Sequence, residues 1–116
     1  LSHGDLGHRN VLAHHAGARW RINGIIDWET TTTGSPLFDV GSLFRYANRA
    51  DDDFRAAFER GYRDAGGTLP DGWFLTARLL DAIFLIEVLS DADDLPEIHA
   101  DMRRLLTRLV ADLEAR

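Results

Sequence analysis

The first ten residues, LSHGDLGHRN (residues 1–10), place a histidine, a carboxylate and an amide within eight positions, interrupted by two glycines. Asp5 and Asn10 lie in a segment that we expect to be a loop between a short strand, Leu1-Ser2, and a β-hairpin. A carboxylate and a carboxamide at this spacing can face the same small volume, one as a base and the other as an oxygen ligand. The stretch therefore predicts the floor of an active site.

A second carboxylate follows in GIIDWE (residues 24–29), where Asp27 stands directly after an apolar run. We expect it at the tip of a buried strand, where a carboxylate is costly unless a cation or hydrogen-bond donors satisfy it. With Asp5 and Asn10 it supplies hard oxygen atoms, which Mg²⁺ prefers alongside phosphates and water. The three residues predict phosphoryl transfer, with one Asp as base and the other two residues holding Mg²⁺ against nucleotide phosphates.

The pattern of the chain changes near Gly34-Ser35-Pro36. Before it, residues 10–27 read as two strands joined by a turn in HHAGA (residues 14–18). After it, apolar spacings of three and four predict about four helices, near residues 37–44, 54–62, 70–89 and 96–113. The second of these should end at the glycine pair 66–67. The fold class that follows is α+β and mostly helical, a β-hairpin plus about four helices in one domain, residues 1–116.

The third and fourth helices differ in their apolar patterns. The third is apolar nearly all round, so we expect it at the centre of a bundle. The fourth opens at Leu95-Pro96-Glu97, where proline suits the first turn. It should bury one stripe of apolar residues: Ile98, Met102, Leu105, Leu109 and Leu113.

Composition limits the partners. The net charge of −6 argues against nucleic acid, whose phosphates demand a positive surface, and permits a cationic small molecule. The densest apolar stretch, LLDAIFLIEVL (residues 79–89), is too short and too charged for a membrane span. The chain has no cysteine, which fits a cytoplasmic protein and excludes thiolate metal sites. We therefore expect a cytoplasmic protein that acts on a small molecule.

Three motifs, HGDLGHRN (residues 3–10), GIIDWE (24–29) and GSPLFDVGSL (34–43), resemble the aminoglycoside phosphotransferase family in order and spacing. That family is related to choline and homoserine kinases and more distantly to protein kinases. The resemblance extends over essentially the whole chain, but only to the C-terminal lobe of the kinase-like fold. It implies a kinase, dependent on Mg²⁺ and on ATP or GTP, that phosphorylates a hydroxyl of a small substrate, as in aminoglycoside antibiotic resistance.

The resemblance also implies a role for each matching residue. Asp5 matches the catalytic base, and Asn10 and Asp27 match the metal ligands. His3 matches a histidine that packs beneath the catalytic loop and fixes its backbone. Asp39 matches a buried aspartate that accepts N–H bonds from that loop.

Two further inferences concern the helical part of the chain. The family often has Gly-Asp-Pro where this chain has Gly34-Ser35-Pro36, and a serine hydroxyl can still cap the helix that starts there. Asp81 and Glu87 are candidates for binding an amine of the substrate, since this lobe binds the hydroxyl substrate in the resembled family. Arg78 could instead neutralise Asp81 as a helix ion pair.

Two alternatives stay open. One is a metal-dependent phosphohydrolase built on His3, Asp5, His8 and Asp27, which requires histidine ligands for a transition metal. The other is a non-catalytic helical interaction module of kinase ancestry. The chain has no lysine and only four residues before Asp5, so we expect the N-terminal nucleotide-binding lobe to be absent. The chain alone should then be inactive and should self-associate through its uncovered face.

Overall fold

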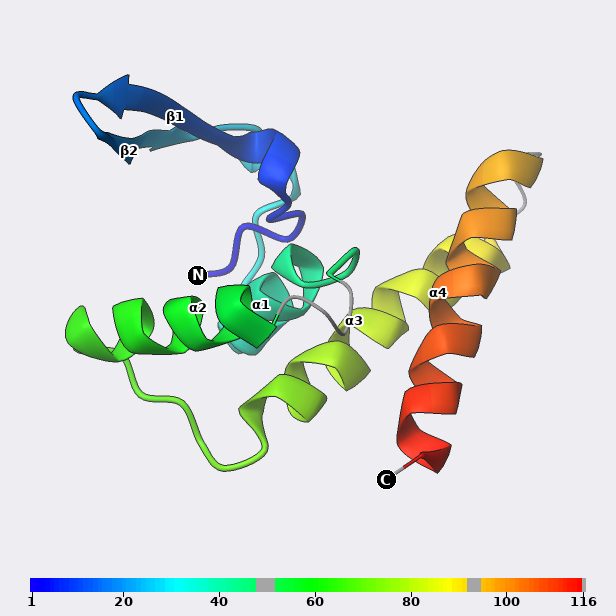
Figure 1. Ribbon diagram of the computed structural model, residues 1–116. Helices are drawn as coiled ribbons and strands as arrows, with labels where there is room; N and C mark the ends of the chain where they lie inside the picture. Colours follow the sequence, from blue (N-terminus) through cyan, green and yellow to red (C-terminus); the bar gives the residue numbers. More distant parts are fainter. Residues whose placement is uncertain (48–51, 92–94, 116) are drawn as a thin grey trace.

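A β-hairpin followed by helices makes up the fold, which is α+β and mostly helical (Figure 1). The computed structural model describes residues 1–47, 52–91 and 95–115. The strands are β1 (Val11–Ala16) and β2 (Arg19–Ile25), and short 3-10 turns, His8–Asn10 and Trp28–Thr30, flank the hairpin. Within the described residues the helices are α1 (Leu37–Leu43), α2 (Asp52–Asp64), α3 (Trp73–Ser90) and α4 (Pro96–Glu114). The predicted fold class is confirmed.

The hairpin turn is shorter than predicted. It consists of Gly17 and Ala18 alone, and Gly17 has a φ of 65° that favours glycine. His14 and His15 belong to β1 and not to the turn, because the two strands pair antiparallel as far as Ala16. The His15 ring contacts that of its cross-strand neighbour Trp20, with 4.5 Å between ring centroids.

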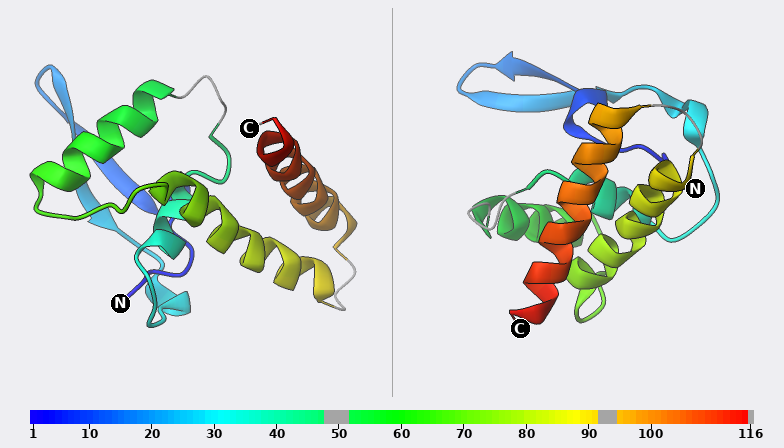
Figure 2. Two further views of the ribbon diagram at one scale, coloured as in Figure 1. Left: turned by 90° about the horizontal axis from the view of Figure 1, so that it is seen from below. Right: turned by 90° about the vertical axis from the view of Figure 1, so that its right-hand side faces the viewer.

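The hairpin projects from the helices (Figures 1 and 2), and its apolar side chains are exposed. Trp20 and Ile22 are each 70% exposed, and Ile25 and Ile26 are 40% and 44% exposed. The expectation of a buried strand before Asp27 is therefore wrong for this structure, because a sheet is buried only where another layer packs on it. The self-association predicted for the chain stays a prediction.

The main core forms where α1, α2 and α3 meet. Phe44, which is 2% exposed, follows α1 directly and lies among the rings of Phe54, Phe58, Trp73 and Phe74, with centroid distances from 4.9 to 6.0 Å. Aromatic rings at such distances add to the stabilisation from burial alone. This cluster fixes the end of α1, from which residues of the site project.

Helix α3 packs against both α1 and α4. It buries Trp73, Ala77, Asp81 and Leu85, but its remaining face is open to solvent. Three apolar residues on that face are 46–54% exposed: Leu79, Ile83 and Ile86. The expected position at the centre of a bundle is thus wrong, because two neighbouring helices cover only part of the circumference. In the described part of the chain, no helix has the length and apolarity that crossing a membrane requires.

Helix α4 begins at Pro96 as predicted, but it buries a narrower stripe. Met102, Leu105 and Leu109 pack in the interior. Ile98 and Leu113 are 44% and 36% exposed, so their predicted burial is wrong. Both lie outside the stripe of α4 that packs in the interior.

The other helix ends follow from local chemistry. Helix α2 ends before Gly66, which has a φ of 86°, and the Gly67 N–H donates to Tyr62 O at 2.9 Å. This is the predicted glycine cap. Helix α3 begins at Trp73, after the predicted Pro70, because Gly72 has a φ of 71° and interrupts a helical path.

Gly41 permits a close approach of α1 to α3. A Cβ atom at this position would lie 2.2 Å from Ala77 O and 2.9 Å from Asp81 Cβ. We expect Gly41→Ala to lower the free energy of unfolding by about 1–3 kcal/mol, because the helices must separate. Gly61→Ala in α2 is the matched control, since nothing lies within 4 Å of its Cβ position. It should raise stability by about 0.5–1 kcal/mol. Urea denaturation measures both effects. A Gly41→Ala variant as stable as the wild type would refute the close packing of α1 on α3.

Candidate active site

His3 anchors the loop that carries Asp5. It is 2% exposed, its Nδ1 accepts the Asp5 backbone N–H at 3.2 Å, and its Nε2 lies 2.8 Å from Ile26 O. Because Nδ1 is an acceptor, the ring proton belongs on Nε2, which donates to Ile26. The ring also packs on Trp28, with 4.7 Å between ring centroids. His3 therefore ties the loop to the segment that precedes Asp27.

Asp39 holds the same loop from α1. Its Oδ2 accepts the His3 N–H at 2.8 Å, and its Oδ1 accepts the Gly4 N–H at 2.9 Å. Thr30 donates its hydroxyl to His3 O at 3.1 Å. A carboxylate that accepts two backbone N–H groups forms charge-assisted bonds, stronger than neutral ones. This contact is structural, the kind that the resemblance implies for Asp39.

Ser2 and Ser35 link the start of the loop to the start of α1. The fully buried Ser2 forms a single antiparallel bridge with Thr32 instead of the expected short strand, and its hydroxyl donates to Ser35 O at 3.2 Å. The Ser35 hydroxyl accepts the Leu37 N–H at 3.2 Å. The predicted capping of this helix by Ser35 is confirmed, so serine replaces the expected aspartate in that role.

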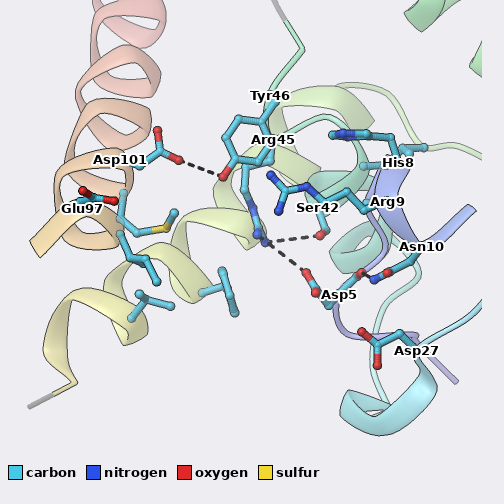
Figure 3. Close-up of a pocket in the computed structure, with 16 residues that line it drawn as sticks. Asp5, His8, Arg9, Asn10, Asp27, Ser42, Arg45, Tyr46, Glu97 and Asp101 are labelled. Atoms are coloured by element: carbon cyan, nitrogen blue, oxygen red, sulfur yellow. Dashed lines mark hydrogen bonds and ion pairs between the residues drawn. The ribbon is translucent and has the colours of Figure 1, made fainter. Parts of the chain in front are cut away.

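An open cavity of about 620 Å³ lies between the loop, the end of α1, α3 and α4 (Figure 3). Its lining combines charged groups from the loop and from α4 with apolar side chains from α1, α3 and α4. The residues are Asp5, Gly7, His8, Arg9, Asn10, Asp27, Ser42, Leu43, Arg45, Tyr46, Phe84, Val88, Glu97, Ile98, Asp101 and Met102. This size and mixture are typical of small-molecule sites.

Asp5, Asn10 and Asp27 all line this cavity. The Asn10 Nδ2 donates to the backbone O of Asp5 at 2.9 Å, so the amide oxygen of Asn10 is left to act as a ligand. Asp27 has a φ of 66°, the only positive φ at a non-glycine position among the described residues. Such a backbone costs about 1–2 kcal/mol and is frequent at functional sites. These oxygen donors fit a hard divalent cation such as Mg²⁺.

Arg45, just after α1, also lines the cavity, and the sequence reasoning missed it. Its Nε and Nη2 donate to the Asp81 carboxylate at 2.8–3.1 Å, and its Nη1 lies 3.9 Å from Asp5 Oδ1. In the sequence, Arg45 stands in FRYANR (residues 44–49), just after a predicted helix, where a cation commonly interacts with the helix C-terminus. The partner Asp81 is 36 residues away in the chain, so no local pattern indicates the pair.

Asp81 and Glu87, the two α3 carboxylates that were candidates for binding a substrate amine, do not line the cavity. Asp81 is 6% exposed and faces Arg45. The alternative prediction, an ion pair between Arg78 and Asp81, is wrong, because Arg78 donates to Asp112 of α4 at 2.6 Å. Glu87 lies on an exposed part of α3. A substrate contact through Asp81 or Glu87 stays a prediction that the geometry does not favour.

The acidic wall of the cavity comes from α4 instead. Glu97 and Asp101 lie across the cavity from Asp5 (Figure 3). Tyr46 donates its hydroxyl to Asp101 Oδ2 at 2.9 Å. Burial and, after it, the hydrogen bond to Asp101 raise the pKa of Tyr46. The hydrogen bond from Arg104 and, after it, the one from Tyr46 lower the pKa of Asp101, so this carboxylate stays negative at neutral pH.

The geometry gives little support to a phosphohydrolase built on histidine ligands. Both ring nitrogens of His3 are already hydrogen-bonded, and Figure 3 shows the ring of His8 directed away from Asp5 and Asp27. Across residues 1–47, 52–91 and 95–115, no group of three or more His, Cys, Asp or Glu side chains is placed to hold a metal ion. A transition-metal site of several histidine and carboxylate ligands is therefore not formed in the described chain.

A comparison with protein-family models matches residues 1–73 to the phosphotransferase enzyme family, APH. The matched part contains the loop, the hairpin, α1 and α2, and ends at the first residue of α3. No curated protein and no solved structure matches the chain.

Proposed function

This chain belongs to the phosphotransferase enzyme family, and from that premise we propose that it is the catalytic-loop and substrate lobe of a small-molecule kinase. The whole enzyme transfers the γ-phosphoryl group of ATP or GTP to a substrate hydroxyl. The observation that carries the proposal is that Asp5, Asn10 and Asp27 line one cavity. A nucleotide-binding lobe is expected to complete the enzyme.

Asp5 acts as the base in this proposal. Its side chain is 50% exposed and lines the cavity, while its backbone N–H and O are both hydrogen-bonded within the loop. A fixed backbone with a half-exposed carboxylate suits a group that must meet a hydroxyl in one orientation. Asp5 accepts the hydroxyl proton as the oxygen forms its bond to phosphorus and the bond to the nucleotide breaks.

Asn10 and Asp27 would hold Mg²⁺ through the amide oxygen and the carboxylate. Bound there, the ion would neutralise charge on the nucleotide phosphates. The rigidity of the surrounding segments supports this role. The backbone O of Ile26, the residue before Asp27, accepts the His3 Nε2–H, and Asn10 O accepts the Ile26 N–H at 2.9 Å. Asn10 and Asp27 are thus held in register across the base of the hairpin.

The substrate class that we propose is a hydroxylated amine. Glu97 and Asp101 provide negative charge on the α4 wall, while Asp5 faces the cavity from the loop. An amine bound by α4 would direct a hydroxyl elsewhere on the same molecule toward Asp5. Arg9 and Arg45 also line the cavity. They compensate the carboxylates near the loop. On the α4 wall Arg104 pairs with Asp101 at 2.6 Å, so Glu97 is the carboxylate of this wall for which the described residues show no ion pair.

The test is an assay of the whole protein that contains this chain, with ATP or GTP, Mg²⁺ and a panel of hydroxylated amines and neutral polyols. We expect Mg²⁺-dependent phosphorylation of the amines, with the product identified by ³¹P NMR. The isolated chain should be inactive, since nucleotide binding requires the other lobe. Hydrolysis of phosphomonoesters without transfer would support the phosphohydrolase instead, and no turnover with any substrate would support a non-catalytic module.

A further inference from the structure

The guanidinium of Arg45 presents only one of its nitrogens to Asp5. Arginine has five N–H donors, and the Nε–H and one N–H of Nη2 bind Asp81 at 2.8–3.1 Å. The second N–H of Nη2 binds Ser42 Oγ at 3.3 Å. The two donors on Nη1 remain, and Nη1 lies 3.9 Å from Asp5 Oδ1 (Figure 3).

The surroundings of Arg45 hold this orientation. Its side chain is 9% exposed, that of Asp81 is 7% exposed, and the Cζ atom lies 4.3 Å from the centroid of the Phe84 ring. A bidentate carboxylate and a stacked ring fix the plane of the guanidinium. The direction of Nη1 is therefore set by groups on α1 and α3, none of which belongs to the catalytic loop.

Stability alone does not account for this buried pair. Desolvation of two charges largely offsets their attraction, so apolar residues of similar volume stabilise a fold equally well. The pair instead joins three segments that are distant in the sequence. Asp81 on α3 holds Arg45, and Arg45 faces Asp5 in the loop. The tight contact at Gly41 keeps α1 near Asp81.

We infer that Arg45 is a positioning residue for the phosphoryl transfer proposed above, on which this inference rests. Nη1 draws Asp5 Oδ1 to one side and leaves Oδ2 facing the cavity for the substrate hydroxyl. At 3.9 Å the contact is an ion pair that a closure of about 1 Å converts into a charge-assisted hydrogen bond. Without it, a half-exposed carboxylate on a loop would sample several rotamers.

Arg45→Lys tests the inference in the whole enzyme. One ammonium group cannot hold Asp81 and Ser42 and also face Asp5, because it lacks the planar fork. We expect kcat to fall by about 10- to 100-fold through misorientation of the base. The KM values for nucleotide and for the hydroxyl substrate should stay within about twofold, since ground-state binding does not use this contact.

Arg78→Lys is the matched control. Arg78 forms another partly buried ion pair on α3, with Asp112 at 2.6 Å, and it does not line the active-site cavity. The kcat of the Arg78→Lys variant should equal that of the wild type. An equal loss of kcat in Arg45→Lys and Arg78→Lys would show a general effect of weakened helix packing, and would overturn the positioning role.

A double variant separates positioning from folding. Arg45→Met with Asp81→Leu replaces the buried pair by apolar side chains, which folds commonly tolerate. Thermal unfolding verifies that the variant is folded, and we expect the same loss of kcat as in Arg45→Lys. Wild-type kcat in the folded double variant would overturn the inference.

A spectroscopic measurement on the whole protein does not depend on its activity. The ¹³C carboxyl resonance of Asp5, assigned by its loss in Asp5→Asn, should shift in Arg45→Lys and keep its position in Arg78→Lys. An unmoved resonance in Arg45→Lys would overturn the inference. A shifted resonance in a protein that transfers no phosphoryl group would support the contact while the proposed function fails, so the two failures are distinguishable.

Discussion

We expect Asp5→Asn to lower the kcat of the proposed phosphotransferase by about 10²- to 10⁴-fold, which is the usual contribution of a general base. The amide has nearly the shape of the carboxylate but cannot accept the hydroxyl proton as readily. Binding of the Mg²⁺-nucleotide should stay close to that of the wild type, because removal of a base affects the transition state and not the bound ground state. Single-turnover kinetics and nucleotide titration measure the two effects separately.

Asp71→Asn is the control for this substitution. Asp71 is exposed in the turn before α3 and does not line the cavity. The kcat of the Asp71→Asn variant should therefore equal that of the wild type. Unchanged kcat in Asp5→Asn would assign the base to another residue. A loss of nucleotide affinity as large as the loss of kcat would show that Asp5 is a ligand of the Mg²⁺-nucleotide.

We expect Gly4→Ala to destabilise the fold by about 3–5 kcal/mol, since it combines a left-handed backbone with a steric clash. Gly4 has a φ of 89°, and a Cβ atom there would lie 2.2 Å from the backbone O of Thr30. Relief of the clash would pull the Gly4 N–H away from Asp39 Oδ1, which accepts it at 2.9 Å. This is a large part of the roughly 5–15 kcal/mol by which a domain is stable.

Gly7→Ala in the same loop is the matched control. Gly7 has a φ of −120°, and nothing lies within 4 Å of its Cβ position. Its free energy of unfolding in urea should stay within about 0.5 kcal/mol of the wild type. Wild-type stability in Gly4→Ala would mean that the loop does not pass against Thr30 as it does here.

Local chemistry in the sequence determined most of the fold. Gly66 marks the end of α2 with a left-handed backbone that few other residues adopt. Pro96 lies in the first turn of α4, where its missing N–H costs nothing, and the Ser35 hydroxyl caps the helix that begins beside it. The spacing of Asp5 and Asn10 in the opening stretch predicted a loop in which both face one volume, and both line the cavity. Such features depend on residues only a few positions apart, so a single sequence is sufficient to recognise them.

Tertiary structure alone decided which faces are buried and which charges meet. The apolar residues on all sides of α3 do not show that Ile83 and Ile86 stay exposed, because burial depends on which helices pack there. Local spacing favoured Arg78 as the partner of Asp81, yet the close packing at Gly41 brings Arg45 to that carboxylate. The contacts of Arg45 with Asp81 and with Asp5 join three segments that are distant in the sequence. No local sequence pattern predicts them, because they form only after the chain has folded.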